Sequence, residues 1–115
     1  MVDTDVGKGA DTLEIERAVA ATFAEHLHST FRVHHDSAVI ELVLIAVSDS
    51  STLRQVMFSL LFRGPFLPAL AQQIYAFEHD GLGRFDLFIV PVRQDTQGLY
   101  YEAIFNRLVD GPARG

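Results

Sequence analysis

Histidine is the residue type in this 115-residue chain that most readily serves acid–base or metal chemistry, and the chain has five of them. His26 and His28 lie two positions apart in a segment with helical periodicity, so their side chains point in nearly opposite directions. His34 and His35 are neighbours at the end of an expected strand and diverge for the same reason. A metal site needs ligands that converge, and His79 would join the others only through the tertiary fold. We therefore expect solvated surface histidines, no metal site and no cofactor.

A nucleophilic enzyme would need a serine or threonine beside a histidine and an acid. Ser59 lies within a strongly apolar segment but lacks the G-x-S-x-G elbow that exposes a serine nucleophile. The chain has no cysteine, which excludes disulfides, thiolate metal sites and cysteine nucleophiles. This inventory favours a non-enzymatic protein. A hydrolase that uses His and carboxylate groups is the alternative.

Glu102 is the carboxylate with the most specific expected role, because it lies between aromatic neighbours in the last apolar segment. Arg63, at the end of the segment 56–63, is its natural counter-ion. We expect a structural ion pair between Arg63 and Glu102, which would specify strand register more than it adds stability. A substrate-binding or catalytic role for the pair is the alternative.

The aromatic residues are expected to form a core, with one alternative for the three tyrosines. Tyr75, Tyr100 and Tyr101 are candidates for lining the mouth of a ligand pocket, since such pockets combine apolar rings with a few polar groups. A small-molecule-binding β-barrel is therefore the second functional hypothesis.

The composition excludes several classes of protein. The chain carries 15 acidic against 9 basic residues, and Lys8 is its one lysine, so a nucleic-acid partner is not expected. No uncharged apolar run reaches about 18 residues, and the acidic first residues lack the apolar core of a signal peptide, so we expect no membrane association and a cytoplasmic location. Hydrophobic residues make up 49% of this small chain, which indicates a partner-binding face or a homo-oligomer.

The periodicity predicts a single domain over residues 12–108, between a disordered tail at 1–11 and a flexible end at 109–115. Apolar residues at a spacing of four predict a helix over Thr12–Ser29, although a capping box at Thr22 would confine it to a short stretch from Phe23. Alternating residues then predict about six strands joined by tight turns, with Pro91 at a sheet edge or bulge. The expected strands cover residues 31–34, 39–47, 56–63, 74–79, 85–92 and 99–107. The predicted fold class is mainly β with one N-terminal helix, its antiparallel sheet curled into a small barrel or sandwich.

The candidates for a protein interface lie in two apolar segments. One is the loop after Gly64, which contains Phe66, Leu67 and Leu70. The other is the apolar stripe of the helix, which contains Ile15 and Val19. The first functional hypothesis is therefore a domain that binds another protein or its own copy.

Several short motifs carry a resemblance to a known family. These are F-S-L-L-F-R-G-P at 58–65, Q-Q-I-Y at 72–75, E-H-D-G-L-G at 78–83, L-F-I-V-P-V at 87–92 and Y-E-A-I-F-N at 101–106. In this order they resemble a family of small bacterial proteins known as domain of unknown function sixty-nine-sixteen, from about Phe23 to Asn106. Gln73 stands where the family is expected to have glycine, and the N-terminal extension is longer than expected. The resemblance implies no activity; it implies an accessory or assembly partner of phage-tail-fibre-like proteins.

Overall fold

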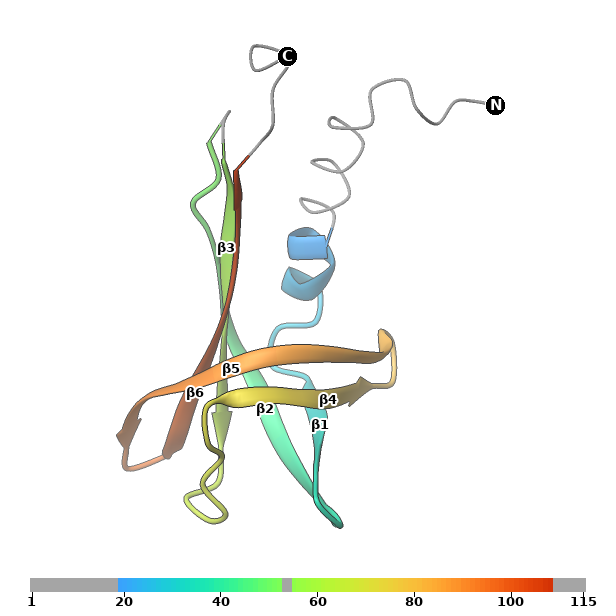
Figure 1. Ribbon diagram of the computed structural model, residues 1–115, viewed down its shortest axis with the longest axis vertical. Helices are drawn as coiled ribbons and strands as arrows, with labels where there is room; N and C mark the ends of the chain where they lie inside the picture. Colours follow the sequence, from blue (N-terminus) through green and yellow to red (C-terminus); the bar gives the residue numbers. More distant parts are fainter. Residues whose placement is uncertain (1–18, 53–54, 109–115) are drawn as a thin grey trace.

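Six antiparallel strands form a closed barrel in the computed structural model, which describes residues 19–52 and 55–108 (Figure 1). The strand order around the barrel is β1-β2-β3-β6-β5-β4. The ring is closed because β1, besides pairing with β2, also pairs with β4. The strands are β1 (Thr30–His35), β2 (Ala38–Asp49), β3 (Gln55–Gly64), β4 (Gln73–His79), β5 (Gly83–Asp95) and β6 (Gly98–Leu108). The fold class predicted from the sequence, mainly β with one short helix and about six antiparallel strands, is confirmed. The predicted tails at 1–11 and 109–115 lie outside the described residues.

The barrel interior follows directly from the alternation along the strands. In β3, Phe58, Leu60 and Phe62 point inward and are at most 2% exposed, while the residues between them face outward and are half-buried. β6 pairs with β3 along its whole length without a bulge. The largest fully buried side chains are Tyr101, Phe31, Phe62, Phe77, Leu42, Leu44, Leu60, Ile89, Val33 and Val56. The barrel therefore encloses a core of interlocking apolar side chains.

Tight turns and two bulges shape the sheet, and one of the bulges lies between Leu44 and Ala46 of β2. The β1–β2 turn places Asp36 at a φ of 55°, and in the β4–β5 turn Gly83 has a φ of 82°. An Asp-Gly pair commonly supplies the positive φ of a hairpin turn, but in this turn Gly83 supplies it and not the Asp80-Gly81 pair. The register between β5 and β6 shifts between Pro91 and Arg93, which confirms the predicted bulge.

The outer face of β5 departs from expectation. A strand with apolar residues on both faces, as in residues 85–92, is expected to be covered on both sides. In the structure Phe88 is 48% exposed and Val92 is 45% exposed. The prediction was wrong because, among the described residues, no second layer covers the outside of this part of the barrel.

The described helix covers residues 19–24, and residues 25–28 continue it as turns. Because the helix already includes Val19, the shorter alternative that begins at Phe23 is wrong. The helix ends earlier than predicted because its last turn tightens, with the His26 N–H donating to the Phe23 carbonyl at 2.9 Å. His28 then adopts a φ of 69° and donates its N–H to the carbonyl of Leu44 at 2.7 Å, which leads the chain into β1. None of the described helical residues forms a segment long and apolar enough to cross a membrane.

Candidate functional site

The main irregularity of the barrel is the separation of β5 from β6. The two strands pair from Val90 and Glu102 down to Asp95 and Gly98. Before this paired stretch β5 pairs with β4, and after it β6 pairs with β3, so the two strands turn away from each other (Figure 1). Within the described part of the chain, residues 83–89 of β5 and 103–108 of β6 thus have a strand partner on one side only.

An apolar cleft of about 450 Å³ lies at this separation, between the helical segment and the two strands. We call it the β5–β6 cleft. Its lining residues are Val19, Thr22, Phe23, Leu82, Phe85, Asp86, Leu87 and Phe105. Phe23 of the helix contacts Phe85 edge-on, with 5.7 Å between ring centroids. On the other side Phe105 stacks on Phe58 with centroids 4.3 Å apart, so rings that belong to the core fix both walls.

Exposed apolar side chains continue this surface onto the outside of the barrel. Phe88 of β5 and Ile104 of β6 face outward beside the point where the strands part, and they are 48% and 57% exposed. Ile74 of β4, which is 64% exposed, is the register partner of Phe88. We call Phe88 and Ile104 the outer lips of the cleft. Cleft and lips together give the separation an apolar inner wall and an apolar outer rim.

Asp86 is the charged residue that lines the cleft, and it is exposed. Among the described residues no ion pair forms with its carboxylate. Its neighbour on the same face of β5, Arg84, instead lies 3.7 Å from Glu78. The rim of the cleft therefore offers a negative charge to whatever binds there.

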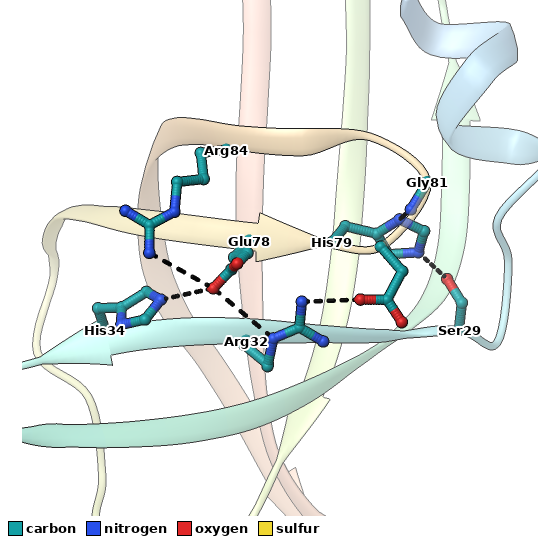
Figure 2. A network of polar contacts seen from close by, with 8 residues as sticks. Ser29, Arg32, His34, Glu78, His79, Gly81 and Arg84 are labelled. Carbon is teal, nitrogen blue, oxygen red and sulfur yellow. Dashed lines mark hydrogen bonds and ion pairs between the residues drawn. The ribbon is translucent and has the colours of Figure 1, made fainter.

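A second constellation, which the sequence did not predict, centres on His79 (Figure 2). The side chain is buried, with 6% exposure, and its ring lies 4.7 Å from that of His26 and 4.4 Å from that of Phe31. The N–H of Gly81 donates to Nδ1 at 2.9 Å, so the ring proton is on Nε2, which donates to Ser29 Oγ at 2.9 Å. The Ser29 hydroxyl donates in turn to the carbonyl of His26.

This arrangement has a clear chemical consequence for Ser29 and His79. A histidine that activates a serine must accept the hydroxyl proton, whereas here His79 donates to the hydroxyl. Burial lowers the pKa of His79, and electrostatic repulsion from nearby His26 lowers it further, which favours the neutral form of the ring. The chain of bonds ties the end of the helical segment to the β4–β5 turn and prepares no nucleophile. The expectation of surface histidines is corrected for His79.

A charged cluster on the outside of β1 and β4 is also drawn in Figure 2. Glu78 hydrogen-bonds His34 at 3.1 Å and lies 3.7 Å from both Arg32 and Arg84. Arg32 also donates to Asp80 at 2.9 Å. The hydrogen bond from His34 is the main cause that lowers the pKa of Glu78. The cluster joins β1 to β4, the two strands whose pairing closes the barrel, and we assign it a structural role in holding them together.

The expected pairing of Arg63 with Glu102 is not formed in the structure. Arg63 donates to the side-chain oxygen of Gln97 at a long 3.4 Å. In the register, Arg63 stands opposite Tyr100, and Glu102 opposite Leu61. Among the described residues no ion pair joins the two side chains. The register makes the two residues diagonal neighbours on one face, within reach of long side chains, but the Arg63 guanidinium donates to Gln97 instead.

The three tyrosines do not line a common pocket mouth. Tyr75, Tyr100 and Tyr101 are at most 4% exposed, and each hydroxyl has an internal partner. Tyr101 accepts the N–H of Leu70 at 2.9 Å, and Tyr75 donates to the carbonyl of Ala71 at 2.8 Å. Tyr100 points outward, where it donates to Asp95 at 2.9 Å. The pocket prediction was wrong because the hydroxyls of Tyr75 and Tyr101 anchor the loop between β3 and β4, and that of Tyr100 bonds the end of β5.

The interface candidates fall into different environments. Phe66 and Leu67 are 47% and 83% exposed, as an interface role requires. Leu70 is 3% exposed and belongs to the core, held there by Tyr101, so it is removed from the candidates. Val19 is half-buried and lines the β5–β6 cleft, and Ile15 lies outside the described residues.

The cleft itself was missed from the sequence. Its lining comes from the helix, the β4–β5 turn, β5 and β6, and their meeting depends on where β5 leaves β6. The sequence signal that was available is Pro91, since a bulge changes the direction of a strand. No three His, Asp or Glu side chains within residues 19–52 and 55–108 converge in a way that would hold a metal ion.

Comparison with known proteins gives one match. The model of a family described as a domain of unknown function (DUF6916) matches residues 18–105. No curated protein and no solved structure matches the chain.

Proposed function

The chain belongs to the DUF6916 family, whose description assigns no function, and from the geometry of its site we propose that it is a protein-binding domain. In this proposal the β5–β6 cleft and its outer lips receive an apolar segment of a partner protein. The role is that of an accessory or assembly domain. A second copy of the chain and a phage-tail-fibre-like protein are the partners that the apolar composition and the family resemblance suggest.

The observation that supports the proposal is that both the β5–β6 cleft, inside the point where the strands part, and the outer lips beside it are apolar. Protein-binding sites expose aromatic and aliphatic side chains around a pocket that holds an anchor residue. Here the lips, Phe88 and Ile104, are about half exposed, and the cleft behind them measures about 450 Å³. Exposing such side chains to water is unfavourable, by roughly 1.5–3 kcal/mol for each that a partner would bury fully. A partner segment would gain this free energy.

The proposal is tested with a random library of twelve-residue displayed peptides, selected on the full chain. We expect enriched peptides that contain large apolar residues. Their affinity should fall about tenfold or more for Ile104→Asp, which removes an apolar lip and adds a charge.

The matched control is Val39→Asp, which places the same charge at another exposed apolar residue, 53% exposed on β2. Both variants must retain the wild-type Tm. A library without enriched peptides, or peptides weakened equally by both substitutions, would refute the proposal.

A further inference from the structure

The edge of β6 is the place where a partner could make backbone hydrogen bonds. Among the described residues, 103–108 of β6 pair with β3 alone, so their other edge has no strand partner. The matching half of β5, residues 83–89, is covered differently, because Phe23 of the helix packs on Phe85 and Leu82 packs against the core. Covering an edge with a helix is one way in which proteins protect it. From the free half of β6, Phe105 lines the cleft that Phe23 of the helix also lines.

The alternation of side chains at this edge suits a strand. On β6, Phe105 faces the β5–β6 cleft and Ile104 faces outward. An added strand also alternates between two faces, so every second side chain would enter the cleft and those between would lie near the outer lips. A helix presents a single apolar stripe and leaves the backbone groups of β6 without partners. The cleft volume of about 450 Å³ leaves room for large inward-facing side chains.

The charge at the rim of the cleft indicates which charged residues the partner segment should carry. The chain has a formal net charge of -6, and Asp86 lines the cleft without an ion pair among the described residues. A lysine or arginine in the added segment would meet this carboxylate. Its side chain would lie on the outer rim, where both partners stay hydrated.

We infer that β6 takes up an extended segment of a partner protein as an additional β-strand along residues 103–108, with a large apolar side chain in the β5–β6 cleft and a basic residue facing Asp86. This inference rests on the proposed function and specifies its partner as an alternating apolar segment with a positive charge. Strand addition of this kind draws affinity from the main chain and specificity from the side-chain pockets.

The test is amide hydrogen exchange, measured by NMR on the full chain with and without a selected peptide. We expect every second amide between residues 103 and 108 to become at least tenfold more protected when the peptide binds. A proline at the peptide position opposite these amides should abolish binding, because proline removes the donor that a ladder needs.

The charge is tested with Asp86→Asn, which should weaken a lysine-containing peptide by roughly two- to fivefold and leave a lysine-free peptide unchanged. Glu41→Gln, an exposed carboxylate on β2, is the matched control and should have no effect.

Three results would overturn the inference. A peptide that binds without protecting β6 would refute strand addition and leave the proposed function intact. Protection of 103–108 in the free chain at every concentration would mean that the chain covers its own edge. Protection that grows with concentration would identify a second copy as the occupant.

Discussion

The hydrogen bond between Tyr101 and the Leu70 backbone leads to a prediction whose size follows from the structure. Tyr101 is 1% exposed, and its hydroxyl accepts the N–H of Leu70, itself 3% exposed, at 2.9 Å. Tyr101→Phe removes one oxygen atom and leaves this buried N–H without a partner. An unsatisfied buried donor costs about 1–3 kcal/mol, so the free energy of unfolding should fall by that amount. Each kcal/mol lowers the Tm of a domain of this size by about 4–8 °C.

Tyr75→Phe is the matched control, because it removes the same atom from an equally buried ring. Its hydroxyl donates to the carbonyl of Ala71, an exposed residue of the same loop, which water can solvate after the substitution. We expect a loss below about 1 kcal/mol, measured by urea denaturation followed by circular dichroism, with an unchanged m-value in both variants. If Tyr101→Phe costs no more than Tyr75→Phe, the role assigned to the Leu70 contact is wrong.

Three further predictions concern other parts of the barrel. Burial lowers the pKa of His79 in the folded chain, so as the pH falls below about 6.5 the unfolded chain binds a proton at this residue before the folded chain does. Urea titrations should therefore show the free energy of unfolding decreasing from pH 7 to pH 5, by at most about 1.4 kcal/mol per pH unit. The decrease should be smaller in His79→Gln. Gly98 has a φ of 151°, and a Cβ there would overlap the carbonyl oxygen of Gly64, so Gly98→Ala should cost roughly 2–4 kcal/mol in thermal or urea unfolding. The control Gly83→Ala should cost about 1–2 kcal/mol, since a Cβ there meets nothing within 4 Å, and equal losses would contradict the steric argument. Arg63→Ala should change stability by less than about 0.5 kcal/mol, and a larger loss would restore a structural role for this arginine.

The strands could be predicted because local alternation alone determines which of their residues face the core. Alternation along the predicted strand 56–63 puts Phe58, Leu60 and Phe62 on one face, and all three are inside the barrel. A sheet edge or a bulge was predicted at Pro91 because proline cannot donate to a ladder, and the structure has a bulge there. Closure into a ring was expected only as one of two possibilities, since the pairing of β1 with β4 depends on residues far apart in the sequence.

The site could not be predicted, for the same reason. The burial of His79 depends on the end of the helical segment, which brings Ser29 and His26 against it. The register makes Arg63 and Glu102 diagonal neighbours, as their expected contact allows, but Arg63 donates to Gln97 in the β5–β6 turn, a partner that strand spacing does not identify. The cleft is formed where two strands part, and side-chain spacing within each strand carries no record of that point.

The short pairing between β1 and β4 has a consequence for the order of folding. Its register joins Arg32 to Glu78, Val33 to Phe77 and His34 to Ala76, whereas β1–β2, β4–β5 and β5–β6 are pairs of consecutive strands. Pairs of consecutive strands form early because they close short loops, and contacts between distant residues form late. The β3–β6 and β1–β4 pairings both join distant strands, but β3–β6 extends over ten residue pairs and β1–β4 over three, so β1–β4 has the fewest contacts to offset the cost of closure. We expect an intermediate in which the sheet is assembled and still open, with β1 and β4 as its two edges. Refolding at high protein concentration should then favour exchange of these edges between chains over closure within one chain.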